Sequence, residues 1–264
     1  MNEKIKDLKQ IELFLLDMDG TIYLDDDVFD GAIEFIEKIR KQNKKYIFLT
    51  NNSSRSKESY LEKLNRLGFV SNSDNIFTSG MAMGIYLNKY YPGKRVYLMG
   101  TTSLRNELLN YGINLVEDDA EIVVAGFDRE LTTEKLEKAC AFLDSGAIFL
   151  ATNPDLVCPI ANHRYVPDCG SMCIMIENAT HKKPFYIGKP NPYMITLLQE
   201  KYNIPNDKIC VIGDRVYTDI MSGINANVKT ICVLSGESTM ETINASPKKP
   251  DYIFNSIKDL IDLI

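Results

Sequence analysis

The stretch that decides the fold is LFLLDMDGTIY, residues 13–23, in which an apolar run ends abruptly in two aspartates. The apolar residues 13–16 predict a buried strand. Asp17 and Asp19 follow it one residue apart, and two carboxylates that close repel each other, more strongly away from water. Gly20 permits a sharp turn directly after them. The segment therefore predicts either a turn with a helix cap or a site that uses both carboxylates.

Outward from this stretch, short apolar runs alternate with helical patterns to the end of the chain. Residues 31–42 (GAIEFIEKIRKQ) carry Ile33, Ile36 and Ile39 at helical spacing, so these three are expected in the core. Residues 46–50 (YIFLT) then predict a strand, and residues 56–68 a helix that Gly68 closes. Such alternation is typical of α/β proteins whose mostly parallel sheets are covered by helices on both faces.

Length and internal alternation favour two α/β units over one continuous sheet. The chain has 264 residues, and segments with Gly, Pro or charge interrupt the pattern near residues 80 and 183. The part between these breaks has its own strand–helix alternation, enough for an inserted unit. We therefore predict a discontinuous core of residues 1–81 and 184–264, and an inserted α/β domain of residues 82–183.

Composition limits the partners and the compartment. Hydrophobic residues make up 45% and charged residues 25% of the chain, as in ordinary globular proteins. The net charge of −6 argues against a nucleic-acid partner, and no apolar run has the length of a membrane span. The six cysteines form no C-x-x-C pair, which favours free thiols over a zinc site. Together these features predict a cytoplasmic protein.

Polar residues follow three further apolar runs in the same way as the aspartates follow residues 13–16. In open parallel sheets, ligands bind just outside the carboxyl ends of the strands. All four runs lie outside the inserted segment, so we expect them in one domain and their polar residues in one site. These further residues are Thr50, Asn51 and Asn52 after the second run, Lys189 after residues 185–188, and Asp214 with Asp219 after residues 210–213.

The residue types in this set indicate phosphoryl chemistry. Several carboxylates in one pocket call for a hard cation, and oxygen ligands favour Mg²⁺. A cation, Lys189 and the hydroxyl of Thr50 together form a cradle for a phosphoryl group. Asp17 can attack phosphorus, because carboxylates form aspartyl-phosphate intermediates. Asp19 is then placed to protonate the leaving oxygen and to take a proton from water.

Each of these residues also has a structural interpretation. Lys189 stands before Pro190, which suits the first turn of a helix. Asp214 and Asp219 are of the type that caps helices or occupies their first turn. Asn52 fits a substrate contact and a helix cap equally well. The presence of all the polar strand ends together favours the functional interpretation.

The motifs resemble those of the haloacid dehalogenase-like superfamily of phosphatases, in the same order along the chain. The four are DMDGT (17–21), LTNN (49–52), GKPNP (188–192) and GDRVYTD (213–219). Further segments resemble the NagD-like, or 4-nitrophenylphosphatase-like, subgroup: TSGMA (78–82), ATNPD (151–155), PDCGSMCIMIE (167–177) and VLSGES (233–238). The resemblance implies a Rossmann-like core with an α/β cap domain inserted between the second and third motifs.

The resemblance also implies roles for the carboxylates. Asp17 would be the nucleophile and Asp19 the general acid and base. Mg²⁺ would be bound by the carboxylates of Asp17 and Asp214 and by the main-chain carbonyl of Asp19. Asp219 would lie behind these groups and contact a water on the metal or Lys189.

Substrate contacts fall in two groups. Thr50, Asn51 and Lys189 would bind the phosphoryl oxygens. Loops of the inserted domain would recognise the leaving group, although ATNPD is also a good turn sequence. The candidates for that contact are Asn153, Asp155, Gly170 and Ser171, and Asn52 after the second motif is a further candidate for a substrate contact.

The function implied is a Mg²⁺-dependent phosphomonoesterase acting on a small soluble phosphate ester, such as a nucleoside monophosphate or a sugar phosphate. A phosphomutase on this scaffold needs a cap between the first and second motifs, where only one helix and its loops fit. A dehalogenase lacks the second aspartate, and a silent binding protein would have lost one of the key residues. The oligomeric state stays open, with a homodimer through the cap as the assembly that the resemblance implies.

Overall fold

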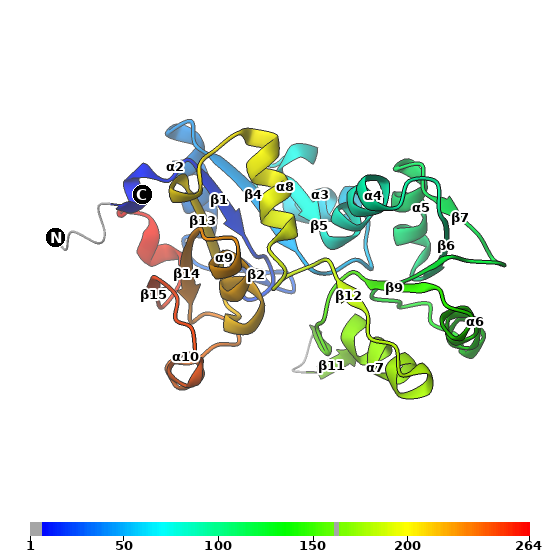
Figure 1. Ribbon diagram of the computed structural model, residues 1–264. Coiled ribbons are helices and arrows are strands. Elements are labelled where there is room, and N and C mark those ends of the chain that lie inside the picture. The colour runs from blue at the N-terminus through cyan, green and yellow to red at the C-terminus, as the bar shows by residue number, and fades with distance from the viewer. Residues whose placement is uncertain (1–6, 161–163) are drawn as a thin grey trace. The chain divides into compact units, whose positions relative to one another are not determined.

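The computed structural model describes residues 7–160 and 164–264, which divide into two compact units (Figure 1). Unit 1 holds residues 7–50, 58–77 and 189–264, and unit 2 holds Asn51–Lys57 and Thr78–Gly188. Each unit has its own sheet and its own apolar core. The α/β class predicted from the sequence is confirmed.

Unit 1 is built on a six-stranded sheet. The neighbouring strands from β15 to β4 all pair in parallel, and β1 lies in the middle between β13 and β4. All four residues of β1 are buried, as are all five of β13, which is the pattern of strands covered on both faces. In spatial order the strands are β15 (Tyr252–Phe254), β14 (Lys229–Val233), β13 (Ile209–Gly213), β1 (Leu13–Leu16), β4 (Lys45–Thr50) and β5 (Ile76–Thr78).

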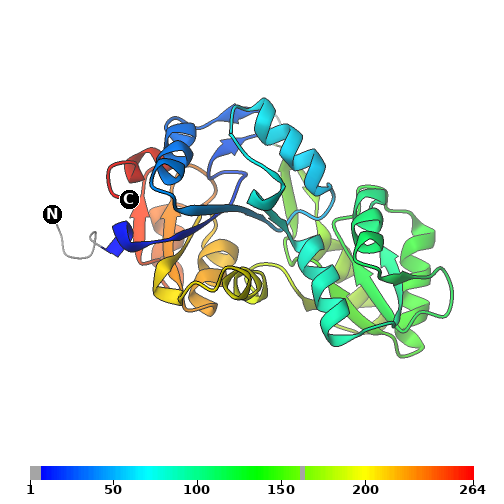
Figure 2. The ribbon, with the colours of Figure 1, turned by 90° about the horizontal axis from the view of Figure 1, so that it is seen from above.

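Helices cover both faces of this sheet, with α2 on one side and α8 and α9 on the other (Figure 2). α2 buries Ile36 and Ile39 as predicted, and Ile33 packs against the same core. Phe35 adds an edge-to-face contact with Phe14 of β1, with ring centroids 5.8 Å apart. The helices of this unit are α2 (Ala32–Lys41), α3 (Lys57–Arg66), α8 (Tyr193–Tyr202), α9 (Met221–Asn225) and α10 (Met240–Ala245).

Shorter elements complete unit 1. A two-stranded antiparallel hairpin, β2 (Tyr23–Leu24) and β3 (Asp27–Val28), directly follows the DMDGT segment. Asp25 adopts φ 53° at its turn, a left-handed conformation that Asp tolerates better than most residues. Short helical turns lie at Asp7–Gln10, Ser73–Asn75, Asn206–Lys208, Val216–Ile220 and Ile257–Leu260.

Unit 2 is a second α/β layer structure. Figure 1 shows α4 and α5 on one face of its sheet and α6 and α7 on the other. The five parallel strands, in spatial order, are β12 (Phe185–Tyr186), β9 (Ile148–Ala151), β8 (Ile122–Ala125), β6 (Arg95–Met99) and β7 (Asn114–Leu115). The helices are α4 (Ser79–Tyr90), α5 (Thr102–Asn110), α6 (Thr133–Asp144) and α7 (Cys169–Thr180).

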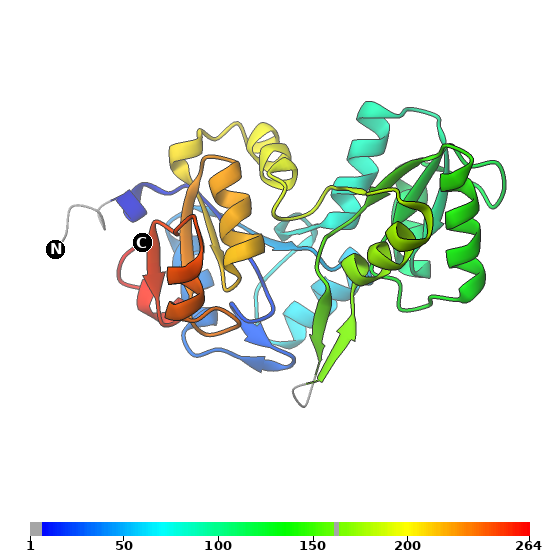
Figure 3. The same cartoon turned by 60° about the horizontal axis from the view of Figure 1, so that its bottom comes forward.

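An antiparallel hairpin of β10 (Val157–Ile160) and β11 (Arg164–Pro167) precedes α7 (Figure 3). α7 buries Cys169, Met172, Cys173 and Ile176 in the core of unit 2. All six cysteines are free, and four of them are buried. In the part of the chain that the structure describes, no helix is long and apolar enough to cross a membrane.

One strand lies in a different unit from the one expected. The strand before Lys189 was expected in the same domain as the strand that carries Asp17, but β12 pairs with β9 at the edge of the sheet of unit 2. Its two residues are exposed and half-buried, which suits a short edge strand better than a central position. Lys189 therefore enters unit 1 from a strand of unit 2, directly after Gly188.

Candidate active site

The predicted site residues of unit 1 meet at the carboxyl ends of three neighbouring strands. β1 pairs in parallel with β13 and with β4, so that Leu16 is level with Ile212 and with Phe48. The main-chain N–H of Asp17 donates to the carbonyl of Ile212 at 2.9 Å, which extends the ladder by one residue. Asp17 and Asp214 thus leave adjacent strands at the same edge, and Thr50 ends the strand on the other side.

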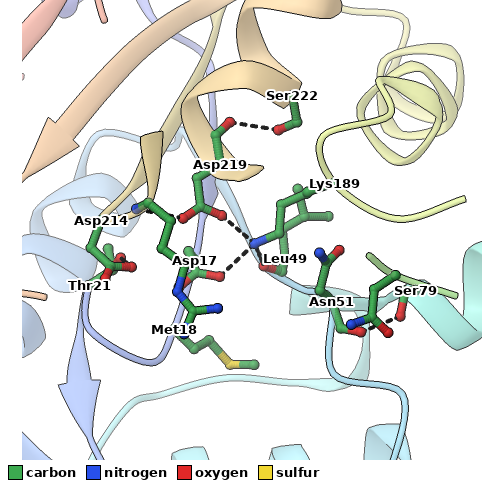
Figure 4. Close-up of polar contacts among 12 residues, drawn as sticks. Asp17, Met18, Thr21, Leu49, Asn51, Ser79, Lys189, Asp214, Asp219 and Ser222 are labelled. Carbon is green, nitrogen blue, oxygen red and sulfur yellow. Dashed lines mark hydrogen bonds and ion pairs between the residues drawn. The ribbon is translucent and has the colours of Figure 1, made fainter. Parts of the chain in front are cut away.

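Lys189 is the centre of this cluster (Figure 4). Its ammonium donates to Oδ1 of Asp17 and to Oδ1 of Asp219, each at 2.6 Å, and to the carbonyl of Leu49 at 3.1 Å. The lysine side chain is only 3% exposed, so nearly all of its hydration has been replaced by these three oxygens. A lysine buried this deeply needs such partners, because an unpaired buried charge is strongly unfavourable.

Asp219 is held from three sides. Besides Lys189 on Oδ1, its Oδ2 accepts from the main-chain N–H of Arg215 at 3.0 Å. Its own carbonyl accepts from the hydroxyl of Ser222 at 2.7 Å (Figure 4). Both carboxylate oxygens are thus occupied, and the side chain is fixed behind Lys189.

Asp214 is enclosed by two glycine-containing loops. Its Oδ2 accepts from the main-chain N–H of Glu237 at 2.7 Å, and its Oδ1 lies 3.5 Å from the hydroxyl of Thr21. A Cβ atom at Gly236 would stand 2.0 Å from Oδ2 of Asp214, and one at Gly20 would stand 2.5 Å from it. Gly20 also has φ 92°, so both the space and the backbone conformation require glycine there.

Burial and mutual repulsion shape the electrostatics. Burial raises the pKa of Asp17 well above its usual range, and Asp219 adds to this, while Lys189 acts in the opposite direction. Burial, together with Asp219, also raises the pKa of Asp214 to about 7. For Lys189, burial acts to lower the pKa, but Asp17 and Asp219 outweigh it and the pKa lies above its ordinary value.

The donor set fits a divalent cation. Carboxylate oxygens of Asp17, Asp214 and Asp219 lie within 4.8 Å of one another. Three carboxylates against the single ammonium of Lys189 leave two negative charges, which a dication would balance. All the side-chain donors are hard oxygen atoms, as Mg²⁺ prefers.

Asp19 and Thr50 differ in their exposure to solvent. The Asp19 side chain is 41% exposed, and its residue forms a bridge with Tyr23 at the start of the β2–β3 hairpin. Nζ of Lys63 lies 3.9 Å from Oδ1 of Asp19. Thr50 is buried as the last residue of β4. Asp19 is therefore the most accessible of the predicted catalytic groups, as a proton donor to a bound ligand requires.

The predicted leaving-group residues of unit 2 form a separate buried network with Asn51. The amide of Asn51 donates to Oδ2 of Asp155 at 2.7 Å, and the amide of Asn153 donates to the same oxygen at 2.9 Å. Asn153 also donates to Oδ1 of Asp168 at 3.1 Å, and Asp168 caps the N-terminus of α7. These side chains bind one another and hold the loop of residues 152–155.

The other three candidates of unit 2 have local contacts. Oδ1 of Asn52 accepts from the main-chain N–H of Ser54 at 2.9 Å and from its hydroxyl at 2.7 Å, which closes a turn. Gly170 is the second residue of α7, and a Cβ there would stand 2.2 Å from the carbonyl oxygen of Pro154. The hydroxyl of Ser171 donates to the carbonyl of Leu156 at 2.6 Å.

Several residues that support the site were not predicted from the sequence. Thr21 and the main-chain N–H of Glu237 contact Asp214, and Asp168 joins the network of unit 2. Thr21 stands inside DMDGT and Glu237 inside VLSGES, so the motifs do contain a signal for both. For Asp168, the signal is its place directly before a helical pattern, where Asp is a favoured cap.

Comparison with known proteins agrees with this geometry. Residues 14–114 match the model of a family described as haloacid dehalogenase-like hydrolase, and residues 186–260 match a second one described as HAD-hydrolase-like. The acid sugar phosphatase of Staphylococcus saprophyticus is 34% identical over 96% of this chain and 98% of its own length.

Solved structures give the same result. The 4-nitrophenylphosphatase of Thermotoga maritima superimposes with a TM-score of 0.93 at 40% identity, covering 97% of this chain and 98% of its own. NagD of Escherichia coli superimposes with a TM-score of 0.89 at 31% identity, covering 96% of this chain and 99% of its own. The chain therefore belongs to the haloacid dehalogenase-like hydrolase family, and within it to the subgroup of NagD and 4-nitrophenylphosphatase.

Proposed function

We propose that this chain is a Mg²⁺-dependent phosphatase that hydrolyses a small phosphate monoester through an aspartyl-phosphate on Asp17. The observation that carries this proposal is the buried ammonium of Lys189, held 2.6 Å from Asp17 and from Asp219 at the carboxyl ends of β1 and β13. Family membership supports the same reaction class, because the named relatives are phosphatases.

The reaction follows from the residues in two steps. A carboxylate oxygen of Asp17 attacks phosphorus, the bond from phosphorus to the ester oxygen breaks, and Asp19 gives its proton to the departing oxygen. Asp19 then takes a proton from a water, whose oxygen attacks the phosphorus of the aspartyl-phosphate. Inorganic phosphate leaves, and Asp17 returns as a free carboxylate.

Positive charge and hydrogen-bond donors around phosphorus stabilise both steps. Lys189 and the hydroxyl of Thr50 would bind the phosphoryl oxygens, with Asn51 beside them. Asp219 keeps Lys189 in place, since both of its oxygens are already committed to Lys189 and to the N–H of Arg215. This arrangement holds the positive charge of Lys189 beside the carboxylate of Asp17.

Mg²⁺ would be held by the carboxylates of Asp17 and Asp214 and by the main-chain carbonyl of Asp19. When bound, it supplies two positive charges that balance the excess carboxylates and the phosphoryl oxygens. Gly20 and Gly236 are required beside Asp214, because any side chain there would displace its carboxylate.

Unit 2 would act as the cap domain that recognises the leaving group. In this proposal Asn153 and Asp155 act by fixing the loop of residues 152–155, since both are buried and bound to each other. Asn52, Gly170 and Ser171 border the same loops. The relatives named acid sugar phosphatase and 4-nitrophenylphosphatase suggest sugar phosphates as the substrate class, with 4-nitrophenyl phosphate as an artificial one.

The segment between the first two motifs supports a hydrolase over a phosphomutase. Between Asp19 and Thr50 the chain forms only the β2–β3 hairpin, α2 and strand β4. No additional domain of the kind expected for a mutase is present in this fully described segment.

The proposal is tested with the purified full chain and a panel of phosphate esters. We expect phosphate release in Mg²⁺, its loss on adding EDTA, and its return with excess Mg²⁺. The variant Asp17→Asn should lose turnover by several orders of magnitude while its circular dichroism spectrum stays unchanged. Turnover that persists in Asp17→Asn would refute the nucleophile, and activity indifferent to EDTA would refute the metal.

A further inference from the structure

Lys63 is a cation beside the proposed catalytic site that the reaction described above does not use. It lies on α3, and its side chain is 13% exposed. Its neighbours on the helix explain this burial, because Tyr60 and Leu64 both face the core of unit 1. Nζ of Lys63 lies 3.9 Å from Oδ1 of Asp19, within ion-pair distance of the proposed acid and base.

The aromatic ring of Tyr23 holds this lysine. Nζ of Lys63 lies 3.9 Å from the ring centroid, a close cation–π contact. The ring itself is immobile, because Tyr23 is fully buried and its hydroxyl donates to Sδ of Met18 at 3.5 Å. Its main chain is tied to the same turn, since the N–H of Gly20 donates to the carbonyl of Tyr23 at 2.8 Å. Lys63 is therefore anchored to the turn that carries Asp19.

A second cation of α3 contacts the far end of the hairpin. Arg66, three residues after Lys63, forms two hydrogen bonds to the carboxylate of Asp26, at 2.8 and 3.1 Å. Residues three apart lie on the same side of a helix. One side of α3 thus contacts the hairpin at its base through Lys63 and at its turn through Arg66.

We propose that Lys63 is a positioning residue that orients the carboxyl group of Asp19 for protonation of the leaving oxygen. This inference rests on the proposed function. The ion pair at 3.9 Å restrains the rotation of the Asp19 carboxyl group, so that its proton is delivered from a fixed direction. Lys63 itself need not touch the substrate. An exposed carboxylate without such a partner would sample several rotamers.

The proposal has a consequence that depends on the leaving group. A sugar alkoxide must receive a proton as the ester bond breaks, whereas 4-nitrophenolate leaves as a stable anion. Loss of orientation at Asp19 should therefore impair the hydrolysis of a sugar phosphate far more than that of 4-nitrophenyl phosphate. The constant kcat/KM isolates this effect, because it reports only the steps up to leaving-group departure.

The test compares kcat/KM for both substrates in the wild type and in Lys63→Met, with Mg²⁺ present. Methionine keeps the length of the stem over Tyr23 and removes only the charge. General acid catalysis contributes about 10²- to 10⁴-fold to the rate. We therefore expect kcat/KM for the sugar phosphate, divided by kcat/KM for 4-nitrophenyl phosphate, to fall about tenfold in Lys63→Met. Lys63→Arg should retain most of the wild-type ratio, and Lys63→Gln replaces Lys63→Met if the latter does not fold.

A matched control is available on α8. Lys201 also makes an ion pair at 3.9 Å, with Asp74, and a cation–π contact at 5.2 Å, with Tyr202, but its side chain is 55% exposed. Lys201→Met removes the same kinds of contact at a place that does not involve Asp19. The ratio of kcat/KM for the two substrates should therefore stay within twofold of the wild-type ratio. In an Asp19→Asn background, Lys63→Met should cause no further change of the ratio, because both act on one group.

The outcomes separate this inference from the function it rests on. A wild type that hydrolyses neither substrate overturns the proposed function and the role of Lys63 with it. An active wild type whose ratio is unchanged in Lys63→Met overturns the role of Lys63 alone. A raised KM with unchanged kcat for both substrates would mean that Lys63 binds substrate, which also overturns positioning.

Discussion

At the scale of single residues, Asp214 has an electrostatic property that the metal-free protein should reveal. Burial and Asp219 raise its pKa to about 7, from an ordinary value of 3.8. Between these two values the folded protein keeps a proton that the unfolded chain has lost, so the free energy of unfolding must fall as pH rises. Below pH 3.8 the stabilisation is complete, and above about pH 7 it is absent.

This prediction is checked by chemical denaturation in EDTA across pH 4 to 8. Over this pH range we expect the free energy of unfolding of the wild type to fall by on the order of a few kcal/mol relative to that of Asp214→Asn, since one pKa unit corresponds to about 1.4 kcal/mol. Asn has nearly the same shape and no charge, so titrating groups that do not interact with Asp214 cancel in the comparison. A difference in the free energy of unfolding between the two proteins that stays constant with pH would contradict the raised pKa of Asp214.

How far the site could be predicted differs from residue to residue. Asp17 and Asp214 follow apolar runs that form adjacent strands, and the rule that ligands bind at the carboxyl ends of parallel strands was enough to bring these two together. Lys189 follows an edge strand of the other sheet, a case that this rule does not cover. The burial of Asn153 and Asp155 could not be predicted in this way, because TNPD describes an exposed turn and a buried polar network equally well. Lys63 was missed because a helical lysine usually lies in solvent, although Tyr60 and Leu64 mark the buried side next to it.

At the scale of elements, the loop of residues 152–155 in unit 2 depends on Asp155. Its Oδ2 accepts from Asn51 and Asn153, and all three side chains are buried. Asp155→Ala would leave two amide groups without this acceptor, and an unsatisfied buried donor costs about 1–3 kcal/mol. We expect a lower free energy of unfolding by about 2 kcal/mol, with kcat/KM reduced through the loosened loop.

Ser171→Ala is the control for this prediction. Ser171 also donates a hydrogen bond within unit 2, to the carbonyl of Leu156, but at an exposed position. Its removal should change the free energy of unfolding by less than about 0.5 kcal/mol. The measurement is denaturation together with steady-state kinetics. Unchanged stability in Asp155→Ala with a raised KM would mean that Asp155 contacts the substrate directly.

The predictability of elements follows their length and burial. The strands β1, β4 and β13 were predicted because most of their residues are apolar and buried. β5 and β15 have three residues each, and the β10–β11 hairpin is largely exposed, so none of them carries a clear apolar pattern. The domain to which β12 belongs was wrongly predicted, because a sequence pattern indicates a strand but not its partner.

At the scale of the whole molecule, two units with separate cores share one chain. The chain passes between them after Thr50, Lys57, Phe77 and Gly188. Two of these four crossings stand next to a proposed phosphate-binding residue, Thr50 in one case and Lys189 in the other. A change in the main chain at either crossing would reach the site through a single peptide unit.

The separation into units predicts where Mg²⁺ stabilises the protein. All its proposed ligands, Asp17, Asp19 and Asp214, lie in unit 1. A ligand at 100 times its dissociation constant stabilises the state that binds it by about 2.7 kcal/mol. If each core opens by itself, only amides of unit 1 gain this protection. Hydrogen exchange with mass spectrometry should therefore show slower exchange in β1, β4 and β13 when Mg²⁺ is added, and no change in β6 and β8.

Asp214→Asn provides the control, because its loss of a ligand should abolish the Mg²⁺ effect on β1 and β13. Equal protection of both units in the wild type would show that the two cores open together, which would contradict the assumption that each core opens by itself. An absence of protection in unit 1 at saturating Mg²⁺ would place the metal elsewhere. The expected asymmetry follows from the position of three aspartates at the ends of two strands, so the exchange pattern tests the site and the division of the chain together.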